Sequence, residues 1–277
     1  MSIRAIVVLY ILLVAIPVFA IRPRTNYERT PATVGITYDS LNIPTVANKR
    51  LTAWLCHSSK DNKDKKLVIL AGPDAGNMSD ELDLVQAITS NLPVDVLLFD
   101  YRGFGMSDLI PIDSDLIAMP EFEEDISSVL KYASTHLVKE TSKLFLYGRS
   151  MGASLSIVAG SALPGLGGVV AESPYTSQSA LQKYYSSLYH KTQSNRSVRL
   201  IRSKVLEPME NIRALKCPLL LMHGEQENQI SSNEISKLFA ACSVSGKSLW
   251  IAAGAGHMEV PYKHTSTFLT MFYTFIQ

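Results

Sequence analysis

The sequence predicts an α/β protein with a doubly wound, mostly parallel sheet. Short apolar runs such as Leu67–Ala71 are continuous rather than alternating, which is typical of parallel strands buried on both faces. From Leu67 to the end of the sequence, apolar runs alternate with segments of helical period, which predicts right-handed strand–helix–strand crossovers. At 277 residues, 47% of them hydrophobic, the chain has enough apolar side chains for one sizeable core.

The predicted elements follow one another in a regular order. In the first two predicted strands, apolar and polar residues alternate imperfectly, which is typical of an antiparallel pair. Ser79 is expected to cap the first helix and Pro120 to begin the second, with acidic residues in the first turns. The predicted strands cover residues 36–45, 51–57, 67–71, 94–99, 144–148, 168–171, 218–223 and 248–252; the predicted helices cover 79–89, 120–136, 231–241 and 265–276, with one more directly after Gly152.

After the sixth strand, residues 176–213 interrupt this alternation and predict a small helical insertion. The segment contains three tyrosines and a group of basic residues. It is either a small lid that shapes the substrate site or a pair of ordinary packing helices with solvated charges. The sequence alone leaves both interpretations open.

A candidate nucleophile lies between the fifth strand and the helix that follows it. The residues from Gly148 to Gly152 fit the pattern Gly-x-Ser-x-Gly, with Ser150 at its centre. A serine between a strand and a helix lies on a strained turn, where a Cβ at either glycine would collide with the neighbouring strand or helix. The setting makes Ser150 the candidate nucleophile.

A base and an acid follow later strands. His257 comes after the last strand and Glu227 after the strand before it, and loops at the carboxyl ends of parallel strands share one crevice. Serine needs a base to become a nucleophile, and an imidazole needs a carboxylate to fix its tautomer. Glu225 is the alternative acid. Glu172, at the end of an adjacent strand, is interpreted as a structural hydrogen-bonding residue.

With these motifs in this order, the sequence resembles the α/β-hydrolase superfamily, and especially its serine-aminopeptidase-like and membrane-anchored "abhydrolase domain" branches. The resemblance covers about residues 36–277 and rests on residues 100–107, 148–152, 172–175, 223–227 and 256–257. It implies an α/β-hydrolase fold and a nucleophile–acid–base triad. The family usually has Asp four residues after the His of its His-Gly pair, where this chain has Glu227.

A second departure concerns the oxyanion hole. The family's loop usually reads His-Gly-x, with the last residue donating its backbone N–H, and the aligned stretch ends in Pro73, which has no N–H. Met151 supplies the first expected donor. The second comes from Gly72 or Asp74, or is missing. Losing one donor typically costs about 2.7–4 kcal/mol of transition-state stabilisation.

Composition disfavours several other classes of protein. A net charge of +1 without a basic patch argues against a nucleic-acid partner. The three cysteines are widely spaced and the remaining histidines have no metal-ligand spacing, so no metal is expected. The glycines at 165, 167 and 168 precede a strand rather than follow one, so they do not form a dinucleotide site. We therefore expect no cofactor.

The first 21 residues are expected to be a signal peptide or an N-terminal membrane anchor. A basic Arg4 precedes 17 residues without charge, and Arg22 follows them. This length falls just short of the ~20 residues that span a bilayer and is slightly long for a secretory signal. Either outcome places the hydrolase domain, residues 30–277, in the secretory pathway or outside the cytoplasm, secreted, periplasmic or anchored.

The leading hypothesis is a serine hydrolase that cleaves an acyl bond through Ser150, His257 and Glu227. An ester or thioester is favoured over a peptide, because its leaving group makes fewer demands on a weakened oxyanion hole. The substrate is then a small acyl compound, a lipid or a peptide, with the membrane a further partner if the N-terminal segment is kept. The alternative is a non-catalytic or weakly active binding protein of this fold at a membrane, which Pro73 and Glu227 favour. The fold itself does not select a substrate.

Overall fold

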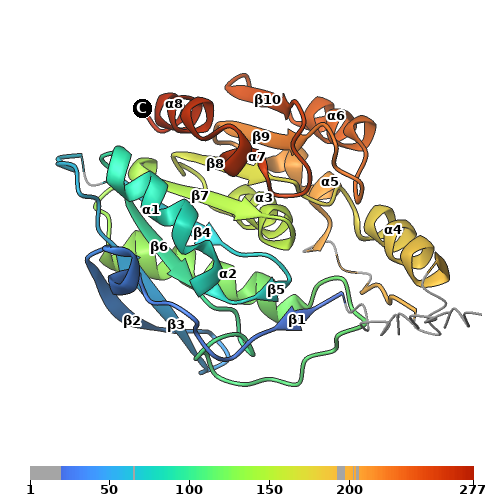
Figure 1. Ribbon diagram of the computed structural model, residues 1–277, viewed down its shortest axis with the longest axis horizontal. Helices are drawn as coiled ribbons and strands as arrows, with labels where there is room; N and C mark the ends of the chain where they lie inside the picture. Colours follow the sequence, from blue (N-terminus) through green and yellow to red (C-terminus); the bar gives the residue numbers. More distant parts are fainter. Residues whose placement is uncertain (1–19, 65, 192–196, 202, 204–205) are drawn as a thin grey trace, which may run out of the picture.

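A mixed eight-stranded sheet forms the centre of the computed structural model, which describes residues 20–64, 66–191, 197–201, 203 and 206–277 (Figure 1). The strand order is β10-β9-β8-β7-β4-β6-β3-β2; β2–β3 and β3–β6 are antiparallel, and all other pairs are parallel. The strands are β2 (Tyr38–Pro44), β3 (Arg50–Cys56), β4 (Leu67–Ala71), β6 (Asp95–Phe99), β7 (Leu144–Arg149), β8 (Gly168–Glu172), β9 (Leu219–Gly224) and β10 (Lys247–Ala252). The predicted parallel sheet with antiparallel first strands is confirmed.

Helices cover both faces of this sheet and create two apolar cores (Figure 1). On one face lie α2 (Pro120–His136), α3 (Met151–Ala162) and α6 (Ser232–Ala241); on the other lie α1 (Leu82–Asn91), α7 (Val260–Lys263) and α8 (Thr265–Phe275). Successive strand residues alternate between the two cores: Ile69 packs in the first and Leu70 in the second. Because both faces are covered, an apolar residue is favourable at every strand position, which explains the continuous runs.

The helical insertion after β8, the sixth strand of the sheet, contains α4 (Gln178–Lys191) and the short α5 (Pro208–Asn211). In Figure 1 α4 lies beyond the carboxyl ends of the parallel strands, apart from the helices that cover the sheet. The described residues also form four short 3-10 helices: η1 (Pro31–Val34), η2 (Met78–Glu81), η3 (Thr141–Lys143) and η5 (Ile212–Ala214).

Two local features differ from the sequence-based expectations. The first helical turn after β4 is η2, and its cap is Asn77, whose side chain accepts a hydrogen bond from the Ser79 backbone; Ser79 itself lies inside the turn. Two-residue strands β1 (Arg22–Pro23) and β5 (Ala75–Gly76) form a separate parallel pair, and β1 lies upstream of the expected domain start at residue 30. Such short strands have no periodicity to detect.

Of the expected N-terminal signal peptide or anchor, residues 1–21, only Ala20 and Ile21 lie among the described residues. Both are buried, and the Ala20 N–H donates to the Ser114 carbonyl at 3.0 Å. Within the described ranges, no helix has the length and apolar character needed to cross a bilayer.

The turn that carries Ser150 depends on two close backbone approaches. A Cβ at Gly148 would lie 2.2 Å from the Gly152 carbonyl oxygen, and one at Gly152 would lie 2.1 Å from the Ala71 carbonyl oxygen. Ser150 adopts φ 53° and ψ −117°, a conformation that L-residues rarely take. The glycines therefore let β7, α3 and the end of β4 meet at one point.

We predict that Gly148→Ala lowers the free energy of unfolding by about 1–3 kcal/mol or more, because the backbone must move to admit the methyl group. Gly246→Ala is the matched control, since the nearest atom to its added Cβ would be 3.7 Å away. Urea denaturation of the three proteins measures the difference. Equal midpoints for the two variants would contradict this account of the turn.

Candidate active site

Ser150 lies at the carboxyl end of β7, at the N-terminus of α3. Its backbone N–H donates to the Glu172 carbonyl at 2.9 Å, and its own carbonyl accepts the N–H of Ala153 at 3.0 Å. The first N–H groups of a helix have no partner within the helix. The N–H of Met151, the first residue of α3, is therefore a donor beside the Ser150 hydroxyl, at the positive end of the helix dipole.

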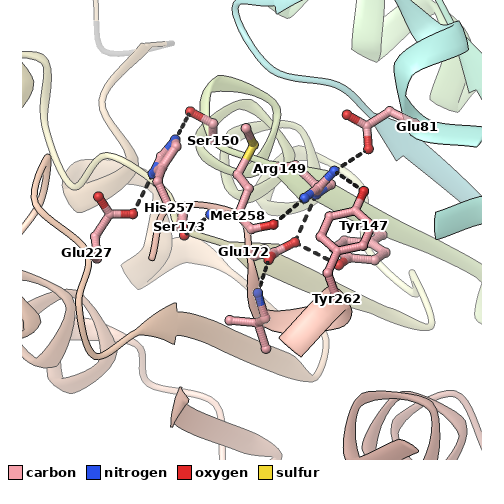
Figure 2. Close-up of polar contacts among 11 residues, drawn as sticks. Glu81, Tyr147, Arg149, Ser150, Glu172, Ser173, Glu227, His257, Met258 and Tyr262 are labelled. Carbon is pink, nitrogen blue, oxygen red and sulfur yellow. Dashed lines mark hydrogen bonds and ion pairs between the residues drawn. The ribbon is translucent and has the colours of Figure 1, made fainter. Parts of the chain in front are cut away.

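The three residues singled out for acyl chemistry meet in space (Figure 2). His257 Nε2 lies 2.9 Å from Ser150 Oγ, and His257 Nδ1 is in direct hydrogen-bond contact with Glu227 Oε2. Glu227 Oε1 accepts the Gln229 N–H at 2.8 Å, which fixes the carboxylate. Ser150, His257 and Glu227 come from the ends of β7, β10 and β9 and form one continuous hydrogen-bonded chain.

The electrostatics of this chain favour an ionised acid. The Glu227 side chain is 1% exposed, and burial alone would raise its pKa. The hydrogen bond from His257 and its charge outweigh burial, so the pKa of Glu227 lies below the usual value. Burial lowers the pKa of the neighbouring His223, so that this side chain stays neutral. Glu227 is thus a carboxylate at neutral pH, able to stabilise a cationic His257.

The other two candidate carboxylates lie elsewhere. Glu225 accepts the Gly254 N–H at 3.0 Å and is exposed. Glu172 is fully buried and accepts hydrogen bonds from Tyr147, Arg149 and the Val260 N–H. The interpretation of Glu172 as a structural hydrogen-bonding residue agrees with these contacts.

The loop expected to complete the oxyanion hole passes close to Ser150. Ala71 pairs with Gly148 in the sheet, so the residues that follow Ala71 run beside the Ser150 turn. The carbonyl of Gly72 accepts the Tyr101 hydroxyl at 3.3 Å, and the carbonyl of Asp74 accepts the Arg22 N–H at 2.8 Å. Pro73 therefore lies in this loop between two residues that carry N–H groups.

The Asp74 side chain contacts the helical insertion. Its Oδ2 accepts the Tyr185 hydroxyl of α4 at 3.2 Å. Burial raises the pKa of Asp74, against the opposing effects of His257, Arg22 and the Tyr185 hydroxyl. Tyr185 therefore links the helical insertion directly to the oxyanion loop.

A groove of about 650 Å³ runs along α4, between this helix and residues 228–231. One wall is the face of α4 that carries Lys183, Tyr184 and Leu188; the other is formed by residues 228–231 and Glu234. Its lining is mixed, with serines and two lysines beside apolar surface. No group of three or more His, Cys, Asp or Glu side chains suited to a metal ion occurs in the part of the chain that the structure describes.

Sequence reasoning missed one part of the site. Arg149, an unassigned position of the Gly-x-Ser-x-Gly pattern, is buried between Glu81 and Glu172 (Figure 2). Glu81 lies 68 residues away in sequence, and no local pattern connects the two. The one available signal was an arginine inside an otherwise apolar strand-to-helix segment, where an unpaired charge would be costly.

Comparisons with known proteins agree with this architecture. Residues 82–195 match the family model "Serine aminopeptidase, S33". The α/β-hydrolase domain-containing protein WAV2 of Arabidopsis thaliana is 22% identical over 222 residues, which cover 78% of this chain and 70% of the relative. A Saccharomyces cerevisiae membrane protein, YNL320W, is 24% identical over 233 residues, which cover 81% and 75%.

Among solved structures, the Pyrococcus furiosus esterase Pf2001 superimposes with a TM-score of 0.75 at 18% identity, over 92% of this chain and 98% of the esterase. The sheet order, the helices on both faces and these matches define the class of protein. The chain has the α/β-hydrolase fold, and its sequence relatives and structural neighbours support a place in the α/β-hydrolase superfamily. The family match and the structural likeness together support a hydrolase.

Proposed function

We propose that this protein is a serine hydrolase that cleaves acyl bonds through Ser150, His257 and Glu227. The observation that carries the proposal is the hydrogen-bonded chain from Ser150 Oγ through the His257 ring to the Glu227 carboxylate. A hydroxyl, an imidazole and a buried carboxylate in this sequence of contacts are the parts that acyl transfer needs.

The geometry supports a two-step mechanism. Ser150 Oγ attacks the acyl carbon while its proton passes to His257 Nε2, and Glu227 stabilises the resulting imidazolium through Nδ1–H. The tetrahedral adduct collapses as His257 returns the proton to the leaving oxygen or sulfur, which leaves an acyl group on Ser150. Water activated by His257 then attacks the acyl-enzyme, and the acid product leaves with Ser150 restored.

For the oxyanion hole we propose the backbone N–H groups of Met151 and Asp74. Met151 N–H belongs to the turn itself. Asp74 is the first residue after Pro73 with an N–H, and the charge of His257 acts on its carboxyl group. Gly72 is the other residue of this loop that could donate. A hole with two donors is worth about 10²–10³ more in rate than a hole with one.

We propose an ester or thioester of a small acyl compound or lipid as the substrate class, with a peptide as the less favoured alternative. The esterase Pf2001 shares the fold, and the groove between α4 and residues 228–231 provides room for an acyl chain with a polar head. The helical insertion, residues 176–213, then acts as a small lid, because Tyr185 ties α4 to the oxyanion loop. Action at a membrane is in keeping with the apolar residues 5–21 and with the yeast relative's description.

The first test is labelling with a fluorophosphonate, which reacts only with an activated serine. We expect wild type to label, and Ser150→Ala and His257→Ala to lose labelling completely or nearly so. Glu227→Gln should slow it by several orders of magnitude, as loss of the carboxylate of a triad does. Ser161→Ala, on the outer part of α3, is the control and should label at the wild-type rate. Folded wild type that does not label would favour the non-catalytic alternative.

A second test concerns the proline in the oxyanion loop. If the Asp74 N–H already serves as the second donor, Pro73→Ala adds an N–H that the site does not need. We therefore expect the labelling rate to stay within about twofold of wild type. A rise of about 10-fold or more, towards the 10²–10³ attributed to one donor, would mean that the hole lacks its second N–H.

A third test addresses the lid. Tyr185→Phe removes the hydroxyl that Asp74 accepts, which weakens the tie between α4 and the loop by about 1 kcal/mol, a factor of about five. In a series of p-nitrophenyl esters of increasing chain length, we expect KM to rise about fivefold for long chains and little for acetate. Tyr273→Phe on α8 is the control. Equal effects on all chain lengths would contradict a lid that contacts the acyl chain.

A further inference from the structure

A buried cation lies directly next to Ser150 and contacts several segments of the site (Figure 2). The Arg149 guanidinium donates through Nη1 to Glu81 Oε2 at 2.5 Å and through Nε to Glu172 Oε2 at 2.9 Å. It also donates through Nη2 to the Met258 carbonyl at 2.5 Å and through Nη1 to the Tyr262 hydroxyl at 3.2 Å. The side chains of Arg149, Glu81 and Glu172 are 4%, 4% and 0% exposed, so solvent does not weaken the two ion pairs.

These partners belong to different segments of the active site. Glu81 is on η2, which follows the oxyanion loop, and Glu172 ends β8. Met258 directly follows His257, and Tyr262 lies on α7, which follows the His257 turn. Arg149 itself is the residue before Ser150. One guanidinium thus connects the turn of the nucleophile, the turn of the base and the segment behind the oxyanion loop.

The base turn has two further ties to the same network. Glu172 Oε1 accepts the Val260 N–H at 3.2 Å, and Ser173 Oγ accepts the Met258 N–H at 3.3 Å. Ser150, Ser173 and Met258 have φ values of 53°, 52° and 57°, so three non-glycine residues with positive φ meet around Arg149. Such conformations cost of order 1–3 kcal/mol each and persist only where surrounding contacts over-determine them.

A gain in folding stability does not by itself explain why Arg149, Glu81 and Glu172 are buried together. Desolvating two carboxylates and a guanidinium is costly, and apolar replacements for buried ion pairs are often neutral or stabilising. Burial would lower the pKa of Arg149, but the two carboxylates outweigh it and hold the pKa well above the usual value, so the cation is permanent. What an apolar residue could not reproduce is the set of directional bonds, above all the bond to the Met258 carbonyl.

We propose that Arg149 is a positioning residue for His257. Its guanidinium, fixed by Glu81 and Glu172, holds the Met258 carbonyl and so keeps the imidazole aligned between Ser150 Oγ and Glu227. This inference rests on the proposed function for its effect on rate, but the alignment of His257 is a property of the structure and can be measured without turnover.

The test compares two buried arginines of the full-length protein. Arg149→Lys keeps the charge, but one ammonium group cannot reach all the acceptors of the planar guanidinium. Arg102→Lys is the matched control: Arg102 is 3% exposed and bonded to the buried Asp125 at 2.5 Å, and its guanidinium bonds to α2 rather than to the His257 turn. Glu81→Gln, which removes one carboxylate charge and leaves Arg149 in place, is the milder second variant.

Three measurements are made on each folded variant: the fluorophosphonate labelling rate, the steady-state kinetics of an ester (kcat and KM), and the downfield proton signal of His257 Nδ1–H. The signal is identified by its loss in His257→Ala. For Arg149→Lys we expect labelling and kcat to fall about 10²-fold, as for a catalytic group displaced by about 1 Å, with KM little changed. The Nδ1–H signal should move upfield or broaden away. Glu81→Gln should show smaller changes in the same direction, and Arg102→Lys should lose stability without moving any of the three.

The outcomes separate the two proposals. If Arg149→Lys and Glu81→Gln keep the wild-type His257 signal and rates, Arg149 is structural and the positioning role is wrong. The positioning role is also wrong if Arg102→Lys disturbs the signal and rates equally. If wild type neither labels nor turns over an ester, but its His257 signal is lost in Arg149→Lys and kept in Arg102→Lys, the positioning role stands and the proposed hydrolysis is wrong.

Discussion

The close approach of three backbone segments around Ser150 is the constraint on which the site depends. Gly148 and Gly152 bring the end of β7, the start of α3 and the carbonyls of Ala71 and Gly72 into contact at distances that no Cβ would permit. This packing forces Ser150 into a positive φ, with its hydroxyl within hydrogen-bond distance of His257 Nε2. It also sets the oxyanion loop beside the first N–H of α3. The strain at Ser150 is maintained by the rigid parallel sheet beneath it.

The sheet contributes a second effect, which is to gather segments that are distant in sequence. Parallel strands β7, β9 and β10 end at the same edge, so the loops that carry Ser150, Glu227 and His257 must meet there. The common edge of the strands brings the loops together, but it does not fix the positions of their side chains. Hydrogen bonds from Gln229 to Glu227, and from Arg149 to the Met258 carbonyl, fix the side chains within those loops. Because both bonds are partly shielded from solvent, each of them is stronger than it would be in water.

The bounds of individual strands and helices show how much of the fold the pattern of neighbouring residues predicts. A continuous apolar run predicts the bounds of β4, and Pro120 with its acidic first turn predicts those of α2, because both signals are local. The sequence places the cap of the turn after β4 at Ser79 rather than Asn77, since both are good caps and the choice depends on where the chain leaves the loop. The sequence does not predict the β1–β5 pair, because two residues are too few to show an alternation of apolar and polar side chains.

The sequence by itself determined the order of the eight strands of the main sheet and of the helices between them, the strained turn at Ser150, and the candidates Ser150 and His257, with the acid narrowed to Glu227 or Glu225. It could do so because apolar periodicity and the Gly-x-Ser-x-Gly pattern are properties of neighbouring residues. Only the tertiary structure decided that Glu227 rather than Glu225 contacts His257, that Tyr185 reaches Asp74, and that Arg149 bonds to Glu81 and Met258. Those partners lie 30 to 111 residues apart, and their pairing depends on how the loops pack above the sheet.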